Sequence, residues 1–156
     1  MEYIYVPKKN LKKNLNKLKN YDQILVEEYI PGREIQVAVA NEKPLGAIEL
    51  RPKRKFYDYF AKYSKKAKTL HIMPAPIGSK KYNEVLSLAV KAHKALKCKG
   101  ITRSDFRYYK KKFYLLEVNT QPGMTKLSLV PEIAAHKGIN FIKLIEWMIK
   151  DASINR

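Results

Sequence analysis

Three oxygen-bearing side chains late in the chain have the types and spacing of a cation site. Glu117 and Asn119 are two residues apart in an apolar run, residues 115–125, that ends in a Pro-Gly turn. On a strand both side chains would leave by the same face. Upstream, residues 101–109 also read as a strand, and they include Asp105. The residues expected to face the core from the second strand are Tyr114, Leu116 and Val118.

A hairpin between these two strands would bring the three side chains together. A three-residue loop of lysines, residues 110–112, places Asp105 opposite Glu117. The same register places Arg103 opposite Asn119. Two carboxylates that face each other across a ladder repel, unless a cation lies between them. Carboxylate and amide oxygens suit Mg²⁺, whose other positions go to phosphates and water.

A second interpretation needs no ligand. Antiparallel sheets commonly expose one charged face to water. Asp105, Glu117 and Asn119 would then lie on the solvent side, with Arg103 and Arg107 as ion-pair partners. The spacing alone does not separate the two interpretations.

Composition limits the class of protein. The chain has 156 residues, enough for the core of one domain. Its 46% hydrophobic and 11% aromatic residues exclude a disordered chain. No apolar run reaches the roughly eighteen residues of a membrane span, and no signal peptide opens the chain. Cys98 is the only cysteine, so an internal disulfide is impossible, which favours a cytoplasmic location.

The net charge of +18 raises nucleic acid as a partner. The lysines, however, are scattered as doublets and triplets, and no basic helix or aromatic-plus-glycine RNA motif collects them. Abundant Lys, Asn, Ile and Tyr also fit the bias of an AT-rich gene. We therefore favour solvation and coding bias over nucleic-acid binding.

The elements around the candidate site predict an α+β fold. Residues 1–20 form a basic segment, either an amphipathic helix with Leu11, Leu15 and Leu18 on one stripe or a frayed end. Residues 21–156 form the main domain. Its expected elements are a buried strand at 24–30, a meander of strands at 33–40 and 45–50, a long functional loop at 56–76, a helix at 79–96 capped by Ser79, a short helix ending near Gly138, and a last helix capped by Asn140. This order predicts an antiparallel sheet with helices packed on one face.

Six stretches in one order resemble the C-terminal part of the D-alanine–D-alanine ligase family, within the ATP-grasp superfamily. They are Glu27-Glu28-Tyr29-Ile30-Pro31-Gly32-Arg33-Glu34, Phe56-Tyr57-Asp58-Tyr59-Phe60-Ala61-Lys62-Tyr63, Cys98-Lys99-Gly100, Arg103-Ser104-Asp105, residues 116–125, and Ser128-Leu129-Val130-Pro131. The resemblance runs from about residue 21 to residue 153. Any one stretch is weak, but six in the family's order are specific.

The resemblance implies an ATP-dependent ligation in peptidoglycan precursor synthesis. ATP would phosphorylate one D-alanine, and the amine of a second would displace the phosphate. Asp105, Glu117 and Asn119 match the positions that hold two Mg²⁺ ions, or Mn²⁺ in their place, against the ATP phosphates. Arg103 and the backbone N–H of Gly123 match the groups beside the oxyanion of the tetrahedral intermediate.

Further positions match the family by role. The nucleotide positions are Glu27, Ile30, Glu34 and Lys62. Tyr63 matches the loop that closes over the substrates. Ser128 and Leu129 match the pocket for the carboxylate of the second D-alanine.

The front of such a ligase has no counterpart in these residues. No two of the six glycines are close enough to cradle a phosphate. We therefore expect the C-terminal half of an ATP-grasp fold, inactive without a separately encoded N-terminal half and with D-alanine and ATP as its ligands. The alternatives are a basic nucleotide- or nucleic-acid-binding module, or an inert remnant of a split ligase gene.

Overall fold

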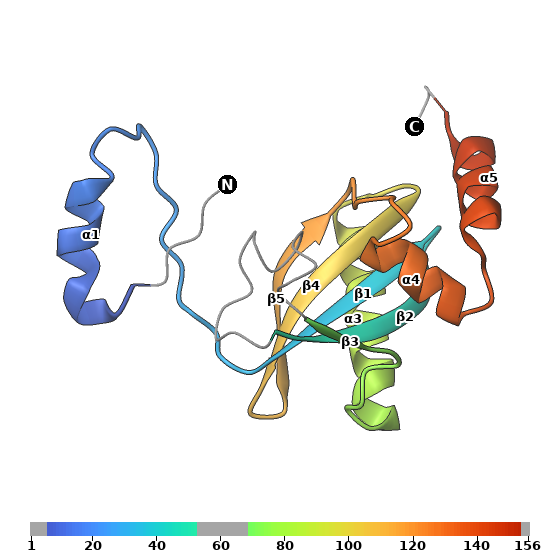
Figure 1. Ribbon diagram of the computed structural model, residues 1–156, viewed down its shortest axis with the longest axis horizontal. Helices are drawn as coiled ribbons and strands as arrows, with labels where there is room; N and C mark the ends of the chain where they lie inside the picture. The colour runs from blue at the N-terminus through green and yellow to red at the C-terminus, as the bar shows by residue number, and fades with distance from the viewer. Residues whose placement is uncertain (1–5, 53–68, 154–156) are drawn as a thin grey trace.

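A five-stranded antiparallel sheet, in the order β3-β2-β1-β4-β5, is the centre of the computed structural model (Figure 1). The structure describes residues 6–52 and 69–153. The strands are β1 (Arg33–Ala40), β2 (Lys43–Arg51), β3 (Leu70–Ile72), β4 (Ile101–Tyr109) and β5 (Lys112–Asn119). The predicted α+β class and the β1–β2 meander are confirmed.

Both hairpins close through tight turns without glycine. Asn41 and Glu42 join β1 to β2 with φ of 45° and 61°, and Lys110 and Lys111 join β4 to β5 with φ of 47° and 63°. Positive φ at both central positions is the pattern of a type I′ turn, whose twist matches that of paired strands. The predicted three-lysine loop is therefore wrong by one residue, because Lys112 already pairs with Tyr109.

Two predicted features upstream of the hairpin need correction. Part of the expected long loop forms β3, which pairs with β2 at the edge of the sheet. The expected buried strand at 24–30 is extended but joins no sheet in the described residues, and Leu25 is 78% exposed. Its apolar residues indicated burial, yet the described part of the chain supplies no strand beside it.

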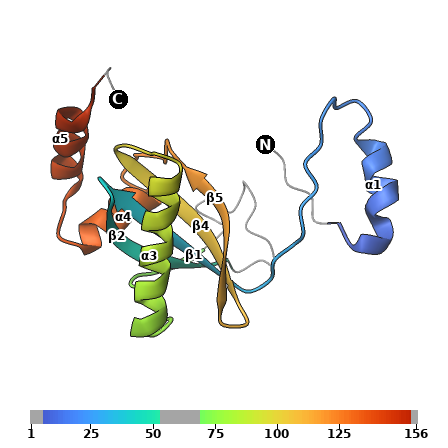
Figure 2. The same cartoon turned by 180° about the vertical axis from the view of Figure 1, so that it is seen from behind.

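Helix α3 (Ser79–Ala95) covers one face of the sheet (Figure 2). Its buried residues Val85, Ala89 and His93 follow the predicted stripe, while Leu96, also expected there, is 60% exposed. Ser79 does not cap the helix, because Gly78 occupies the N-cap position with φ 76°. The core under α3 contains Ile35, Val37, Val39, Ala47 and Phe106.

The other face carries α4 (Leu129–His136), and α5 (Phe141–Asp151) packs against α4 and stands beyond the sheet (Figure 1). Asn140 caps α5 as predicted, since its Oδ1 accepts from the Lys143 N–H at 2.9 Å. The residues shared by this second core are Ala38, Ile48, Ile101, Val130, Ile133, Ala134 and Leu144. Helices therefore cover both faces rather than the single face predicted. No helix in the described ranges is long and apolar enough to cross a membrane.

The N-terminal segment extends away from the sheet in both views (Figures 1 and 2). It contains a 3₁₀ turn (η1, Lys8–Asn10) followed by α1 (Leu11–Lys17). The helical alternative for residues 1–20 is thus observed, although α1 buries none of its residues. The following apolar side chains are exposed, with Tyr21 at 63% and Val26 at 55%.

His93 is a buried histidine in the α3 core. It is 1% exposed, and its Nδ1 lies 2.8 Å from Thr102 Oγ1. Burial lowers the pKa of His93; Glu42 and the Cys98 backbone oppose this shift, while Lys99 and Lys94 add to it. The folded state therefore disfavours a charged imidazole.

Stability should consequently fall as the pH drops below about 6.5, where the histidine of the unfolded chain gains its proton but the folded one does not. The loss should not exceed roughly 1.4 kcal/mol per pH unit for one proton. Urea unfolding at pH 7.5 and 5.5 measures it. His93→Gln should reduce the pH dependence of the free energy of unfolding, whereas substitution of the exposed His136 by Gln should leave that dependence unchanged. Equal slopes in all three chains would contradict this prediction.

Candidate active site

The β4–β5 hairpin brings the predicted cation ligands into the expected register. Asp105 lies opposite Glu117, and Arg103 lies opposite Asn119. The register survives the shorter turn because a bulge follows: Phe106 pairs with Leu115, so Leu116 is an extra residue. The two changes offset each other, and the site end of the hairpin matches the prediction.

The bulge also changes the environment of the second strand. Leu116, predicted to face the core, is 51% exposed. Val118 and Tyr114 are only half-buried.

Strand β1 extends the polar face. Glu34 pairs with Arg107, and Gln36 pairs with Asp105. The alternating residues Ile35 and Val37 belong to the core under α3. The polar face is therefore the face of the sheet opposite α3.

Arg103 holds the two carboxylates of the hairpin. Its Nε and one terminal nitrogen donate to the Asp105 carboxylate at 2.7 and 3.0 Å. The same terminal nitrogen lies 3.7 Å from Glu117 Oε1. The ion pairing of the second interpretation is thus present, but Asp105 is only 7% exposed and is not a solvated surface acid.

The loop after β5 brings together three further predicted residues. Asn119 Oδ1 accepts from the Gln121 N–H at 2.9 Å, which starts the turn. Ser128 Oγ accepts from the Thr125 N–H at 3.0 Å, and Leu129 then begins α4. A Cβ on Gly123 would lie 3.0 Å from Ser128 Oγ, so the backbone of Gly123 closely approaches this serine.

The predicted nucleotide residues are only partly brought to this face. Glu34 is 9% exposed and lies 3.6 Å from the Arg107 guanidinium. Glu27 is exposed and Ile30 half-buried in the segment before β1. Lys62 and Tyr63 lie outside the described residues.

The donor set fits a hard cation. Asp105 and Glu117 offer carboxylate oxygens, and Asn119 offers an amide oxygen, the ligands that Mg²⁺ prefers. Within the described residues no group of three or more His, Cys, Asp and Glu side chains gathers. Two carboxylates and an amide are therefore the candidate ligands. Arg103 lies on the same hairpin, and its positive charge balances the negative charge of the Asp105 carboxylate.

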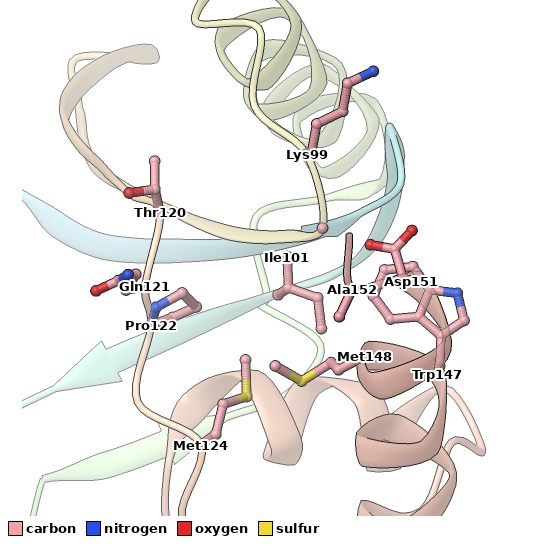
Figure 3. A pocket seen from close by; sticks show the side chains of 11 residues that line it. Lys99, Ile101, Thr120, Gln121, Pro122, Met124, Trp147, Met148, Asp151 and Ala152 are labelled. Atoms are coloured by element: carbon pink, nitrogen blue, oxygen red, sulfur yellow. The ribbon is translucent and has the colours of Figure 1, made fainter. Parts of the chain in front are cut away.

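A cavity of about 330 Å³ lies beside the loop (Figure 3). Ile101, Met124 and Met148 meet at its centre, and Trp147 forms one wall. Thr120, Gln121 and Pro122, which follow Asn119, form another part of its lining. None of the predicted site residues that the structure describes lines this cavity.

Sequence reasoning missed Gln36. It is 1% exposed on the polar face, and its Nε2 donates to Glu34 Oε1 at 3.2 Å. A signal was available, since Gln36 lies two residues after Glu34 in an alternating strand and must share its face.

Comparison with known proteins places the chain in a family. The family model described as D-ala D-ala ligase C-terminus matches residues 5–150. A D-alanine–D-alanine ligase of Pelagibacter ubique (strain HTCC1062) is 63% identical over 155 residues, which cover 99% of this chain and 51% of that protein. A D-alanine–D-alanine ligase of Bacillus anthracis has a TM-score of 0.79 at 33% identity, over 96% of this chain and 49% of that one.

A second structure of the Bacillus anthracis ligase, complexed with ATP, has a TM-score of 0.76 at 29% identity, over 93% of this chain and 46% of that one. The chain thus spans about half the length of the relatives it matches. It corresponds to their C-terminal portion. With a family model over most of its length, this chain belongs to the D-alanine–D-alanine ligase family and has the C-terminal part of its ATP-grasp fold.

Proposed function

We propose that this chain supplies the metal- and phosphate-binding part of an ATP-dependent D-alanine–D-alanine ligase. The register that places Asp105 opposite Glu117, and Arg103 opposite Asn119, supports the proposal most directly. In the reaction, a D-alanine carboxylate oxygen attacks the γ-phosphorus of ATP, and ADP leaves. The amine of a second D-alanine then attacks the acyl carbon, and phosphate leaves with formation of the peptide bond.

The residues of the polar face divide this work. Asp105, Glu117 and Asn119 would hold Mg²⁺, which when bound neutralises charge on the phosphoryl oxygens. Arg103, already oriented by two hydrogen bonds to Asp105, would donate to the oxygen that becomes negative at the acyl carbon. The N–H of Gly123 would donate to the same oxygen.

The remaining residues bind substrate. Ser128, whose Oγ is fixed by Thr125, and Leu129 at the start of α4 would bind the carboxylate of the second D-alanine. Glu34 would bind the ribose side of ATP, with Glu27 and Ile30 nearer the adenine. Lys62 and Tyr63 complete the proposed set from outside the described residues. The free thiol of Cys98 fits a reducing compartment such as the cytoplasm.

We further propose that turnover requires residues equivalent to the N-terminal half of the relatives. The exposed apolar segment before β1 supports this requirement. Tyr21, Leu25 and Val26 are each more than half exposed, and α1 buries nothing. Exposed apolar patches of this kind commonly mark an interaction surface, so we expect this segment to contact the N-terminal half.

Complementation tests the proposed function. The full chain is mixed with the separately produced N-terminal half of the Pelagibacter ubique ligase, ATP, Mg²⁺ and D-alanine. Release of ADP and formation of D-alanyl-D-alanine should require both halves and D-alanine. Each half alone provides the control. No dipeptide, although both halves are folded by circular dichroism, would contradict the proposal.

A different result would favour the nucleic-acid alternative. That alternative predicts binding to an oligonucleotide that weakens steeply with added salt and survives Asp105→Ala. The ligase proposal predicts Mg²⁺-dependent ATP binding that Asp105→Ala abolishes.

A further inference from the structure

Gln36 has an unused hydrogen-bonding atom on the candidate site face. The residue is 1% exposed, and its Oε1 is buried without a hydrogen-bond partner in the described structure. Buried polar atoms are usually paired, because an unpaired one loses its hydration without compensation. An unpaired oxygen at the edge of a binding site is therefore an acceptor that a ligand can satisfy.

The neighbours of Gln36 fix which atom is free. Its Nε2 donates to Glu34 Oε1 at 3.2 Å. Exchanging the amide nitrogen and oxygen would place two acceptors against each other, so this bond sets the orientation. The Gln36 amide consequently lies next to the Glu34 carboxylate with its oxygen as the atom left without a partner, and the residue itself pairs with Asp105 across the ladder.

The two adjacent acceptors select a particular ligand chemistry. A carboxylate and an amide oxygen side by side match two neighbouring hydroxyl donors and reject a phosphate. Arg107, 3.6 Å from the other oxygen of Glu34, balances the charge of that carboxylate. A vicinal diol, such as the 2′- and 3′-hydroxyls of a ribose, has the required pair of donors.

We propose that Gln36 is a specificity-determining residue for the ribose of the nucleotide. Its N–H orients Glu34, and its Oε1 accepts from one ribose hydroxyl while Glu34 accepts from the other. This assignment rests on the proposed function, in which Glu34 lies on the ribose side of ATP. The assignment adds Gln36 to the proposed nucleotide-binding residues and predicts that the site discriminates against deoxynucleotides.

The test compares ATP with its 2′-deoxy and 3′-deoxy analogues. Dissociation constants are measured by calorimetry with Mg²⁺, for the full chain mixed with the N-terminal half described above. In Gln36→Met, which keeps the volume and removes both polar atoms, ATP should bind about 5- to 10-fold more weakly. The binding of at least one deoxy analogue should weaken much less in this variant than the binding of ATP. The ratio of the two dissociation constants should therefore fall by a similar factor.

Ser104→Ala is the matched control. Ser104 Oγ is also buried and unpartnered, but Ser104 pairs with Val37 of the α3 core and so lies on the opposite face. Its loss should change the melting temperature without changing the ratio of ATP to deoxy-ATP affinities. Gln36→Asn, which withdraws the amide by one methylene, gives a second variant if Gln36→Met unfolds.

Three outcomes overturn the inference. If the wild-type mixture binds no ATP, the proposed function and this assignment both fail. If ATP binding depends on Asp105 but the ratios are unchanged in Gln36→Met, the proposed function stands and this assignment fails. If both Gln36 variants unfold, the side chain serves the fold, and the assignment is withdrawn.

Discussion

Asp105→Asn should weaken Mg²⁺-dependent ATP binding by at least about 100-fold, the upper end of what losing even an outer-shell partner of a metal costs. Asparagine keeps the shape of the side chain but removes one of the two candidate carboxylates. Arg103, which now donates to both oxygens of Asp105, would keep one acceptor at this position but lose the charge that balances its own, so its charge would oppose a bound cation. Calorimetric titration with ATP, with and without Mg²⁺, measures the loss.

Glu42→Gln is the matched control for this variant. Glu42 is also an acid next to a strand, but it lies in the β1–β2 turn and pairs with Lys94 at 2.8 Å. The Glu42→Gln substitution therefore removes one negative charge, as Asp105→Asn does, but at a position outside the candidate site. Equal ATP affinities in Asp105→Asn, Glu42→Gln and the wild type would remove Asp105 from the metal site.

Arg33→Met should have the largest effect on stability, a loss of about 3 kcal/mol in the free energy of unfolding. Arg33 donates to both oxygens of Glu49 at 2.7 Å, and to the Pro76 carbonyl at 3.0 Å. Burial alone would raise the pKa of Glu49, but hydrogen bonds from Arg33 and Arg51 hold that pKa below its ordinary value. Without Arg33, a carboxylate that is 2% exposed keeps, among the described residues, the ion pair with the more exposed Arg51.

Urea unfolding at neutral pH measures this loss. Lys81→Met breaks the pair with Glu84, whose carboxylate is 39% exposed rather than 2% as in Glu49, and should cost less than about 1 kcal/mol. The double variant Arg33→Met/Glu49→Gln should recover most of the stability, since position 49 then carries no buried charge that needs a partner. If Arg33→Met costs no more than Lys81→Met, the buried pair contributes nothing beyond a surface pair.

The candidate site was largely predictable because its residues are close in sequence. Asp105 and Glu117 lie on consecutive strands joined by a tight turn, so a short count along the ladder relates them. The count used a three-residue loop and a regular ladder, and neither is present. Both errors amounted to one residue, in opposite directions. The correct pairing of Asp105 with Glu117 therefore came from two errors that cancelled, because neither the turn nor the bulge has a glycine or proline signal.

Features that depend on distant packing were less predictable. The first half of β1 alternates polar and apolar residues, which indicated one covered face. Its second half, residues 37–40, is apolar throughout, and residues 37–39 are buried, which is the pattern of a strand between two layers. An alternating pattern over the whole strand predicts only one covered face, so it did not indicate that α4 packs on the second face. The apolar residues 24–26 likewise indicated burial, but in the described structure Leu25 and Val26 are more than half exposed, because the hydrophobic pattern alone does not specify what covers a segment.

The bulge at Leu116 divides the β4–β5 hairpin into two halves with independent alignment. The central strand β1 pairs with β4 on both sides of the bulge, from Ile101 to Tyr108, and only the tip at residues 109–112 extends beyond it. A residue gained or lost at the tip can be absorbed at Leu116 without moving the carboxylates. A change in the length of the tip therefore need not alter the pairing of Asp105 with Glu117.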